Sequence, residues 1–336
     1  MKYPITRIAA VAGAVALAAA TLAGCTSSTT PSSSGSASAG GGAVKADIVV
    51  ATGPTMSNAN VYIAESEGIF EKNGLTATNE TLTAGSDAIP QLLSGAWTYA
   101  AVDTATAITA VQQGVGVVAV ATQQVGVPER DGYAAIMVKP DSGITDIAGL
   151  QGHKVQVNAL GGSAEALVKA SVVQAGGDPD KVEFVEIAPP QAIPAIQAGQ
   201  VDAVFLSEPL LTAGLGAGLV DIANPEQNTI PDVPAFVMLA SKQYVAENPQ
   251  AVKQFQAAIE EAGALANSDH DLVIETAKTS TTVDPAVLAK VSRFPVWGDA
   301  PLTADDIQKF MDFLEENGLL DKGKAPKASD IVADLG

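Results

Sequence analysis

Short apolar runs alternate with helix-like segments along most of the chain. Asp47–Thr52 is an apolar run typical of a buried strand, and the turn-rich stretch Gly53–Asn58 follows it. A helix is predicted from about Ala59 to Asn73, where Gly74 closes it. Further strands are predicted over 117–121, 134–138, 154–157, 182–187, 203–206 and 236–240. This alternation predicts an α/β fold with mainly parallel sheets.

A short internal echo indicates two related units. The sequence Ala-Ile-Pro occurs at residues 88–90 and again at 192–194, and a glycine follows each copy at the same distance. The apolar strands that come next end at Asp103-Thr104 and at Ser207-Glu208. Because ligands of open parallel sheets bind beyond the carboxyl ends of the strands, we expect these two strand ends to line one cleft. A match this short also arises by chance, which is the alternative.

The first 25 residues have the pattern of an export signal. Lys2 and Arg7 come before or at the start of an alanine-rich run that ends at Gly24, and this run is too weakly apolar for a span of about 20 residues. The run closes on Leu22-Ala-Gly-Cys25, which resembles a bacterial lipobox with cleavage before Cys25 and lipidation of its thiol. An ordinary secretory signal with an incidental cysteine is the alternative.

The segment behind Cys25 predicts a tether. Residues 26–42 are almost entirely Ser, Thr, Gly and Ala, so they cannot bury enough apolar surface to become ordered. We therefore expect a signal peptide at 1–24 and a lipidated cysteine with a flexible tether at 25–43. The expected location is the outer face of the bacterial cell membrane, held there by the lipid anchor only.

The net charge and the cysteine content limit the partners and the kinds of site that this chain can have. Removal of Lys2 and Arg7 from the 18 basic residues leaves 16 against 37 acidic ones, a net charge of −21. This charge argues against nucleic acid as a partner, and any anionic ligand would need local dipoles or a rare cation. Cys25 is the only cysteine, which excludes an intrachain disulfide, a second thiol nucleophile and a thiolate metal site.

Three segments resemble one family of binding proteins. Residues 62–75, YIAESEGIFEKNGL, resemble the helix YIA-x3-GFF-x3-GL of nitrate/sulfonate/taurine and thiamine-precursor binding proteins. Residues 149–155, GLQGHKV, resemble that family's entry to the second lobe, and 198–203 with Glu208-Pro209 resemble its GQVDA…EP segment. Order and spacing match from about Asp47 to Leu320.

The resemblance implies a fold with two lobes. The expected fold is the type II periplasmic-binding-protein fold, α/β, with two doubly wound lobes joined by a hinge of two crossings near Tyr133–Lys139 and Ile230–Met238. The expected bounds are 44–137 plus 235–336 for lobe one and 138–234 for lobe two. The implied function is capture of a small polar organic molecule, whether anionic, zwitterionic or amine-bearing, and its delivery to an ABC permease with its ATPase. We expect a monomer and no cofactor.

Two departures from the family's pattern leave the ligand open. Residues 95–99, GAWTY, stand where Gly-x-x-Asp is common, and Leu210-Leu211 follow the Glu-Pro pair where an aromatic residue is frequent. Both changes can reshape the pocket.

The candidate ligand contacts lie at strand ends and helix starts. The turn 158–163 offers backbone N–H groups and a hydroxyl at a helix N-terminus, which suits an anionic or carbonyl group, although a plain Ser N-cap is the alternative. A carboxylate at 208 can pair with a ligand amine, which would favour an amine-bearing or zwitterionic molecule over nitrate; a structural role is the alternative. The predicted contacts are Ser57, Asn58, Ser86, Asp103, Thr104, Asn158, Gly162, Ser163, Ser207 and Glu208.

Other polar and aromatic residues are weaker candidates. Arg130 can clamp a sulfonate or carboxylate or can simply be solvated. Trp97, Trp297 and Tyr62 are more typical of a core than of a ligand site. The two histidines, His153 and His270, are far apart and read as surface residues, so we expect no metal site.

Two other classes of function stay open. No nucleophile elbow, glycine-lysine phosphate loop or Cys/His cluster occurs, so we predict no catalytic residue and no enzymatic activity. An enzyme on the same scaffold is one alternative, although the related pyrimidine-synthesising enzyme depends on a cysteine-rich motif that this chain lacks. An exported sensory or adhesive lipoprotein with this fold is the other.

Overall fold

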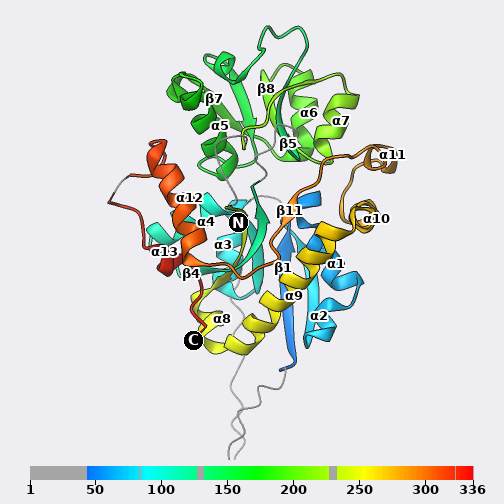
Figure 1. Ribbon diagram of the computed structural model, residues 1–336, viewed down its shortest axis with the longest axis vertical. Helices are drawn as coiled ribbons and strands as arrows, with labels where there is room; N and C mark the ends of the chain where they lie inside the picture. The colour runs from blue at the N-terminus through cyan, green and yellow to red at the C-terminus, as the bar shows by residue number, and fades with distance from the viewer. Residues whose placement is uncertain (1–43, 83–84, 127–131, 227–232, 322, 336) are drawn as a thin grey trace, which may run out of the picture. The chain divides into compact units, whose positions relative to one another are not determined.

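The protein has an α/β fold with two mixed sheets (Figure 1). The computed structural model describes residues 44–82, 85–126, 132–226, 233–321 and 323–335. The predicted signal peptide, Cys25 and tether lie outside these residues, as does Arg130. Within the described residues, no helix has the length and apolar character needed to cross a membrane.

The first sheet has six strands in the order β11-β4-β10-β3-β1-β2. β1 is parallel to β2 and β3, whereas β10 is antiparallel to both β3 and β4. All five residues of β3 are buried, as expected for a strand covered on both faces. The strands are β1 (Ala46–Thr52), β2 (Leu75–Thr81), β3 (Tyr99–Asp103), β4 (Val117–Val125), β10 (Pro234–Ser241) and β11 (Val296–Trp297).

The second sheet repeats this plan with five strands in the order β7-β6-β8-β5-β9. β6 is parallel to β7 and β8, and β5 is antiparallel to β8 and β9. β3 and β8 therefore hold the same place in their sheets, and they carry the two halves of the sequence echo. The strands are β5 (Ala134–Val138), β6 (Lys154–Val157), β7 (Glu183–Glu186), β8 (Ala203–Ser207) and β9 (Val220–Ala223).

Helices connect the strands of both sheets. α3 and α6, which contain the two Ala-Ile-Pro copies, each end before a glycine with positive φ, Gly95 at 75° and Gly199 at 70°. The helices are α1 (Ala59–Ser66), α2 (Ile69–Lys72), α3 (Gly85–Ser94), α4 (Thr104–Gln112), α5 (Ser163–Gln174), α6 (Pro189–Gln197), α7 (Leu210–Gly216), α8 (Lys242–Glu247), α9 (Pro249–Ser268), α10 (His270–Ser280), α11 (Pro285–Leu288), α12 (Ala304–Glu316) and α13 (Ala328–Ile331), with 3-10 turns at Met56–Asn58, Ile147–Leu150 and Pro179–Lys181.

The predicted helix from Ala59 to Asn73 is wrong in one respect, because it is two helices. Gly68 adopts a left-handed φ of 68° between α1 and α2, which breaks the regular helix. The pattern also missed β2, whose sequence LTATNET alternates apolar and polar residues only weakly at the sheet edge. The short strands β9 and β11 were missed as well.

Two connections join the sheets. The first runs from β4 to β5 and the second from β9 to β10. β5 lies between β8 and β9 in the second sheet, so the predicted crossing at Tyr133–Lys139 and the predicted boundary at 137/138 are too late. The first crossing must end before Ala134, because the strand that begins there already pairs with β8. β10 begins at Pro234, beside the predicted boundary at 234/235.

The first sheet is held on one face by an aromatic stack. The ring of Tyr99 lies 3.6 Å from that of Phe255, which in turn stacks on Phe70 at 6.1 Å. Each fully buried aromatic side chain contributes about 1.5–3 kcal/mol through burial, so this stack pins α9 and α2 to β3. Trp297 also belongs to this core, being 1% exposed.

Candidate functional site

A cavity of about 260 Å³ lies at the carboxyl ends of β3 and β8. This is the place at which the open-sheet rule puts a ligand. Both sheets, both connections and the segment after α10 contribute to its wall. It is lined by Gly53, Pro54, Thr55, Ser57, Asn58, Leu82, Ala101, Val102, Asp103, Tyr133, Asn158, Ser163, Ala164, Leu167, Ala188, Pro189, Pro190, Phe205, Ser207, Glu208, Pro209, Leu210, Glu226, Ala235, Phe236, Thr282 and Val283.

The structure brings most of the predicted contact residues to this cavity. Seven of them line it: Ser57, Asn58, Asp103, Asn158, Ser163, Ser207 and Glu208. Thr104 does not, because its buried hydroxyl donates to the Pro234 carbonyl at 2.6 Å. Gly162 is buried and is not among the lining residues, and the side chain of Ser86 lies outside the described residues.

Asp103 links the two sheets at one side of the cavity. Its Oδ1 accepts the Thr106 N–H at 3.0 Å, which caps α4, and its Oδ2 accepts the Thr106 hydroxyl at 2.7 Å. The same Oδ1 accepts the Ser163 N–H at 2.9 Å and the Ser163 hydroxyl at 3.0 Å, at the start of α5. The Ser163 Oγ also accepts the Ala105 N–H at 3.3 Å. One carboxylate therefore satisfies donors at two helix N-termini.

Four backbone donors of the turn before α5, the N–H groups of residues 160–163, are already occupied. The Leu160 N–H donates to Glu186 at 3.0 Å and the Gly161 N–H to Glu165 at 2.9 Å. The Gly162 N–H donates to the Ala159 carbonyl at 3.4 Å. The chain's own acceptors thus bind the N–H groups of residues 160–163, whereas the predicted ligand contact of this turn stays a prediction.

The matching turn of the first sheet is held by amide side chains. The Asn58 Nδ2 donates to the Gly53 carbonyl at 2.9 Å, and its Oδ1 accepts from Gln123 at 3.1 Å. The indole N–H of Trp297 donates to the Ser57 carbonyl at 2.8 Å. Asn58 and Trp297 therefore fix the backbone of this turn, and the Ser57 side chain lines the cavity without a hydrogen bond among the described residues.

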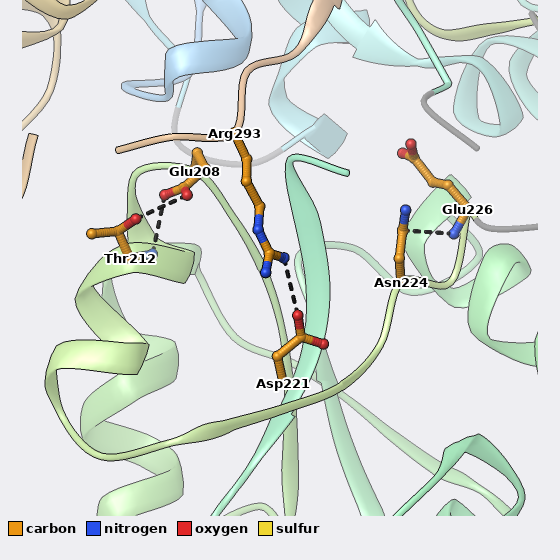
Figure 2. Close-up of polar contacts among 6 residues, drawn as sticks. All are labelled: Glu208, Thr212, Asp221, Asn224, Glu226 and Arg293. Carbon is orange, nitrogen blue, oxygen red and sulfur yellow. Dashed lines mark hydrogen bonds and ion pairs between the residues drawn. The ribbon is translucent and has the colours of Figure 1, made fainter. Parts of the chain in front are cut away.

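Glu208 follows β8 and is buried at the cavity wall (Figure 2). Its two carboxylate oxygens accept the N–H and the hydroxyl of Thr212, at 3.0 and 2.9 Å. Burial raises the pKa of Glu208, and the hydrogen bonds from Thr212 and the charge of Arg293 act in the opposite direction. The desolvated carboxylate lines the cavity from the turn between β8 and α7.

A further polar contact ties the chain after α11 to the second sheet. Arg293 comes from the segment that follows α11, and its guanidinium pairs with Asp221 of β9 at 3.0 Å (Figure 2). Both side chains are largely buried, at 20% and 9% exposure. Thr282 and Val283, which precede α11, line the cavity. The ion pair thus fastens this wall segment, residues 281–295, to the second sheet.

Sequence reasoning missed several residues of the wall. Tyr133 was placed in a hinge, yet its hydroxyl hydrogen-bonds Gln124 and donates to Glu226 at 3.3 Å, which ties the two connections together. Burial raises the pKa of the Tyr133 hydroxyl, and the nearby Glu226 acts in the same direction. The alternation of β8 would have identified Phe205, two residues before Ser207 and on the same face.

The wall is acidic and apolar. Three carboxylates line the cavity, Asp103, Glu208 and Glu226, and no Lys, Arg or His does so among the described residues. Nor do those residues contain a cluster of three or more His, Cys, Asp or Glu side chains that can hold a metal ion. The arrangement suits a small molecule held by hydrogen bonds and apolar contacts.

Comparison with known proteins gives the family. The family model described as NMT1/THI5 like matches residues 55–270, which is more than half of the chain. The chain belongs to the NMT1/THI5-like family. A binding protein of Brucella abortus is 26% identical over 261 residues, 77% of each chain. An Escherichia coli protein named as an aliphatic sulfonates-binding protein is 28% identical over 208 residues, 61% of this chain and 63% of that one.

Solved structures show the fold of this family member. The alkanesulfonate-binding protein SsuA from Xanthomonas axonopodis pv. citri, bound to MOPS, superposes with a TM-score of 0.72 at 21% identity, over 86% of this chain and 99% of the other. The desulfurization enzyme DSZB also shares the fold, with a TM-score of 0.55 at 17% identity over 86% and 96%. The fold is that of periplasmic binding proteins, and it carries both binding and catalysis.

Proposed function

We propose that this protein is an extracytoplasmic solute-binding protein that captures a small polar organic molecule in the cavity and delivers it to an ABC importer. The observation that carries the proposal is the placement of polar residues from both sheets around one cavity at the carboxyl ends of β3 and β8. Family membership supports it, because the relatives reported above are named as binding proteins.

Binding in such a cavity couples to the arrangement of the sheets. A ligand that contacts Ser57 on one side and Ser207 on the other favours the conformation in which both are within reach. A permease with a cytoplasmic ATPase would then accept the closed form. On this proposal the protein works as a monomer and needs no cofactor.

The proposal includes export and a lipid anchor. Its support is the sequence pattern that ends at Cys25, with the only cysteine of the chain placed at the end of an apolar run. Replacement Cys25→Ser should release the exported protein from the membrane fraction and abolish incorporation of labelled fatty acid. Unchanged membrane association of Cys25→Ser would contradict the anchor and leave the binding function standing.

An enzyme is the second candidate, because DSZB has the same fold. The two functions differ in what happens to the bound compound. A thermal-shift screen should find a compound that stabilises the protein by about 2.7 kcal/mol at a concentration of 100 Kd. We expect that compound to be recovered unchanged after incubation with the protein. Its conversion into a product would support the enzyme, and the absence of any stabilising compound would count against capture.

A third candidate is a sensory or adhesive lipoprotein with the same cavity. Uptake separates it from transport: cells that lack this protein should lose import of the stabilising compound. Normal import in such cells would favour sensing or adhesion.

A further inference from the structure

We propose that the cavity accepts an organic ammonium ion with a compact apolar body and excludes anions. This inference rests on the proposed capture function and narrows its ligand class. The first ground is that the chain's own carboxylates occupy positions where an anion would bind. The second is that the other side chains of the wall can accept hydrogen bonds from an ammonium group or pack against an apolar body.

The N-termini of α4 and α5 meet at the cavity wall, and their dipoles favour negative charge there. That charge is already supplied by Asp103, which is 4% exposed and accepts from Thr106 and Ser163 at the two helix starts. A sulfonate or carboxylate that bound the N–H groups of Thr106 and Ser163 would have to displace this carboxylate. It would also meet Glu208 and Glu226 in the wall, and no described Lys, Arg or His lines the cavity beside them.

Residues 160–163 of the turn before α5 offer an anion no free N–H group. Their N–H groups donate to Glu186, Glu165, Ala159 and Asp103. Three of these four acceptors are carboxylates, and Glu165 among them also pairs with Lys169. Repulsion between like charges in a desolvated site opposes a second anion strongly.

A cation finds partners in the same wall. Each Glu208 oxygen accepts one hydrogen bond from Thr212 within the described part of the chain, and a carboxylate oxygen has capacity for two. The side chains of Asn158 and Ser207 line the cavity and make no hydrogen bond within the described part of the chain, so they can accept from an ammonium group. A protonated amine would also place a second positive charge, beside that of Arg293, near the buried Glu208 carboxylate.

The remainder of the wall suits an apolar body. Phe205 and Phe236 come from the central strands of the two sheets, and Leu82, Val102 and Leu167 complete the surface. Aromatic faces attract ammonium groups and pack against hydrocarbon. A volume of about 260 Å³ limits the ligand to a small molecule.

The test uses probes that share a carbon skeleton and differ in charge. Butylammonium and benzylammonium are titrated calorimetrically into the protein beside butanesulfonate, phenylmethanesulfonate and inorganic sulfate. We expect the wild type to bind at least one ammonium probe and none of the anions. Glu208→Gln should weaken that binding by about tenfold or more. Asp180→Asn, an exposed acid on the second sheet's periphery, is the matched control and should change nothing.

The second part of the test removes the carboxylate of Asp103 from the starts of α4 and α5. Asp103→Ala exposes the N–H groups at the starts of α4 and α5, so this variant should gain binding of sulfate or a sulfonate. If Asp103→Ala does not fold, Asp103→Asn keeps the Oδ1 acceptor and removes the charge, and it should lose affinity for the ammonium probe. A folded Asp103→Ala that binds no anion would overturn the argument from the helix termini.

Three outcomes separate this inference from the function on which it rests. A wild type that prefers a sulfonate to the matching ammonium probe overturns the ligand class and leaves capture standing. So does a wild type that binds a neutral compound and no probe of either charge. If no compound of any charge binds, and native mass spectrometry finds no bound small molecule, the proposed function itself fails.

Discussion

Glu208 shows how burial sets the chemistry of a single residue in this protein. Its carboxylate is desolvated at the cavity wall, and Thr212 and Arg293 compensate only in part, so its pKa lies above the usual 4.5. The folded state therefore holds a proton more tightly than the unfolded chain does. The stability that Glu208 contributes is present below the unfolded-state pKa and is lost as pH rises through the folded-state pKa.

Glu208→Gln should remove this pH dependence. The glutamine oxygen can still accept from the Thr212 N–H, but the side chain never ionises. We expect the free energy of unfolding of the variant to rise relative to that of the wild type as pH increases from about 4.5 towards neutrality. Urea unfolding of both proteins at a series of pH values measures this difference in free energy of unfolding. A difference between the two proteins that stays constant with pH would contradict this assignment.

At the scale of elements, α9 packs on β11 with no room for a side chain. A Cβ at Gly263 would lie 2.1 Å from the Gly298 carbonyl oxygen, and a Cβ at Gly298 would lie 2.4 Å from that of Thr122. Asn267 of α9 completes the contact by exchanging hydrogen bonds with the Trp297 backbone at 2.9 and 3.0 Å. Through Trp297 this packing also positions Ser57 at the cavity.

The same substitution at two glycines should have opposite effects. Gly263→Ala should destabilise the protein by about 2–3 kcal/mol, because the helix must move away from β11. Gly216→Ala in α7 meets no atom within 4 Å and should stabilise by about 0.5–1 kcal/mol, because alanine favours helix more than glycine does. Chemical denaturation of both variants measures these changes. A Gly263→Ala variant as stable as the wild type would refute the close approach.

The elements also show what the sequence could and could not predict. Apolar runs identified β1, β5, β6 and β8, because strands buried on both faces leave a continuous hydrophobic signal. The echo placed Asp103 and Ser207 at equivalent strand ends. The pattern could not show that Asp103 reaches across to Ser163, since a contact over 60 positions leaves no local trace. For the same reason the turn before α5 resembled an open anion site.

At the scale of the molecule, two polar contacts hold the sheets together around the cavity, Asp103 with Ser163 and Arg293 with Asp221. We expect both to favour the closed arrangement. Arg293→Met should therefore weaken ligand affinity by about tenfold and destabilise the protein by about 3 kcal/mol, because Asp221 loses this partner. A double-mutant cycle with Asp221→Asn should give a coupling energy of about 1–3 kcal/mol. Additive effects of the two substitutions would contradict a direct role of the pair.

Capture of a small molecule in the cavity is tested most directly by native mass spectrometry of protein purified without unfolding. We expect one small-molecule adduct per chain that disappears on denaturation. Ser207→Trp, which fills the cavity, should lose the adduct, whereas Ser268→Trp at the exposed end of α9 should keep it. A wild type with the same mass before and after denaturation, or an adduct that survives Ser207→Trp, would contradict capture at this site.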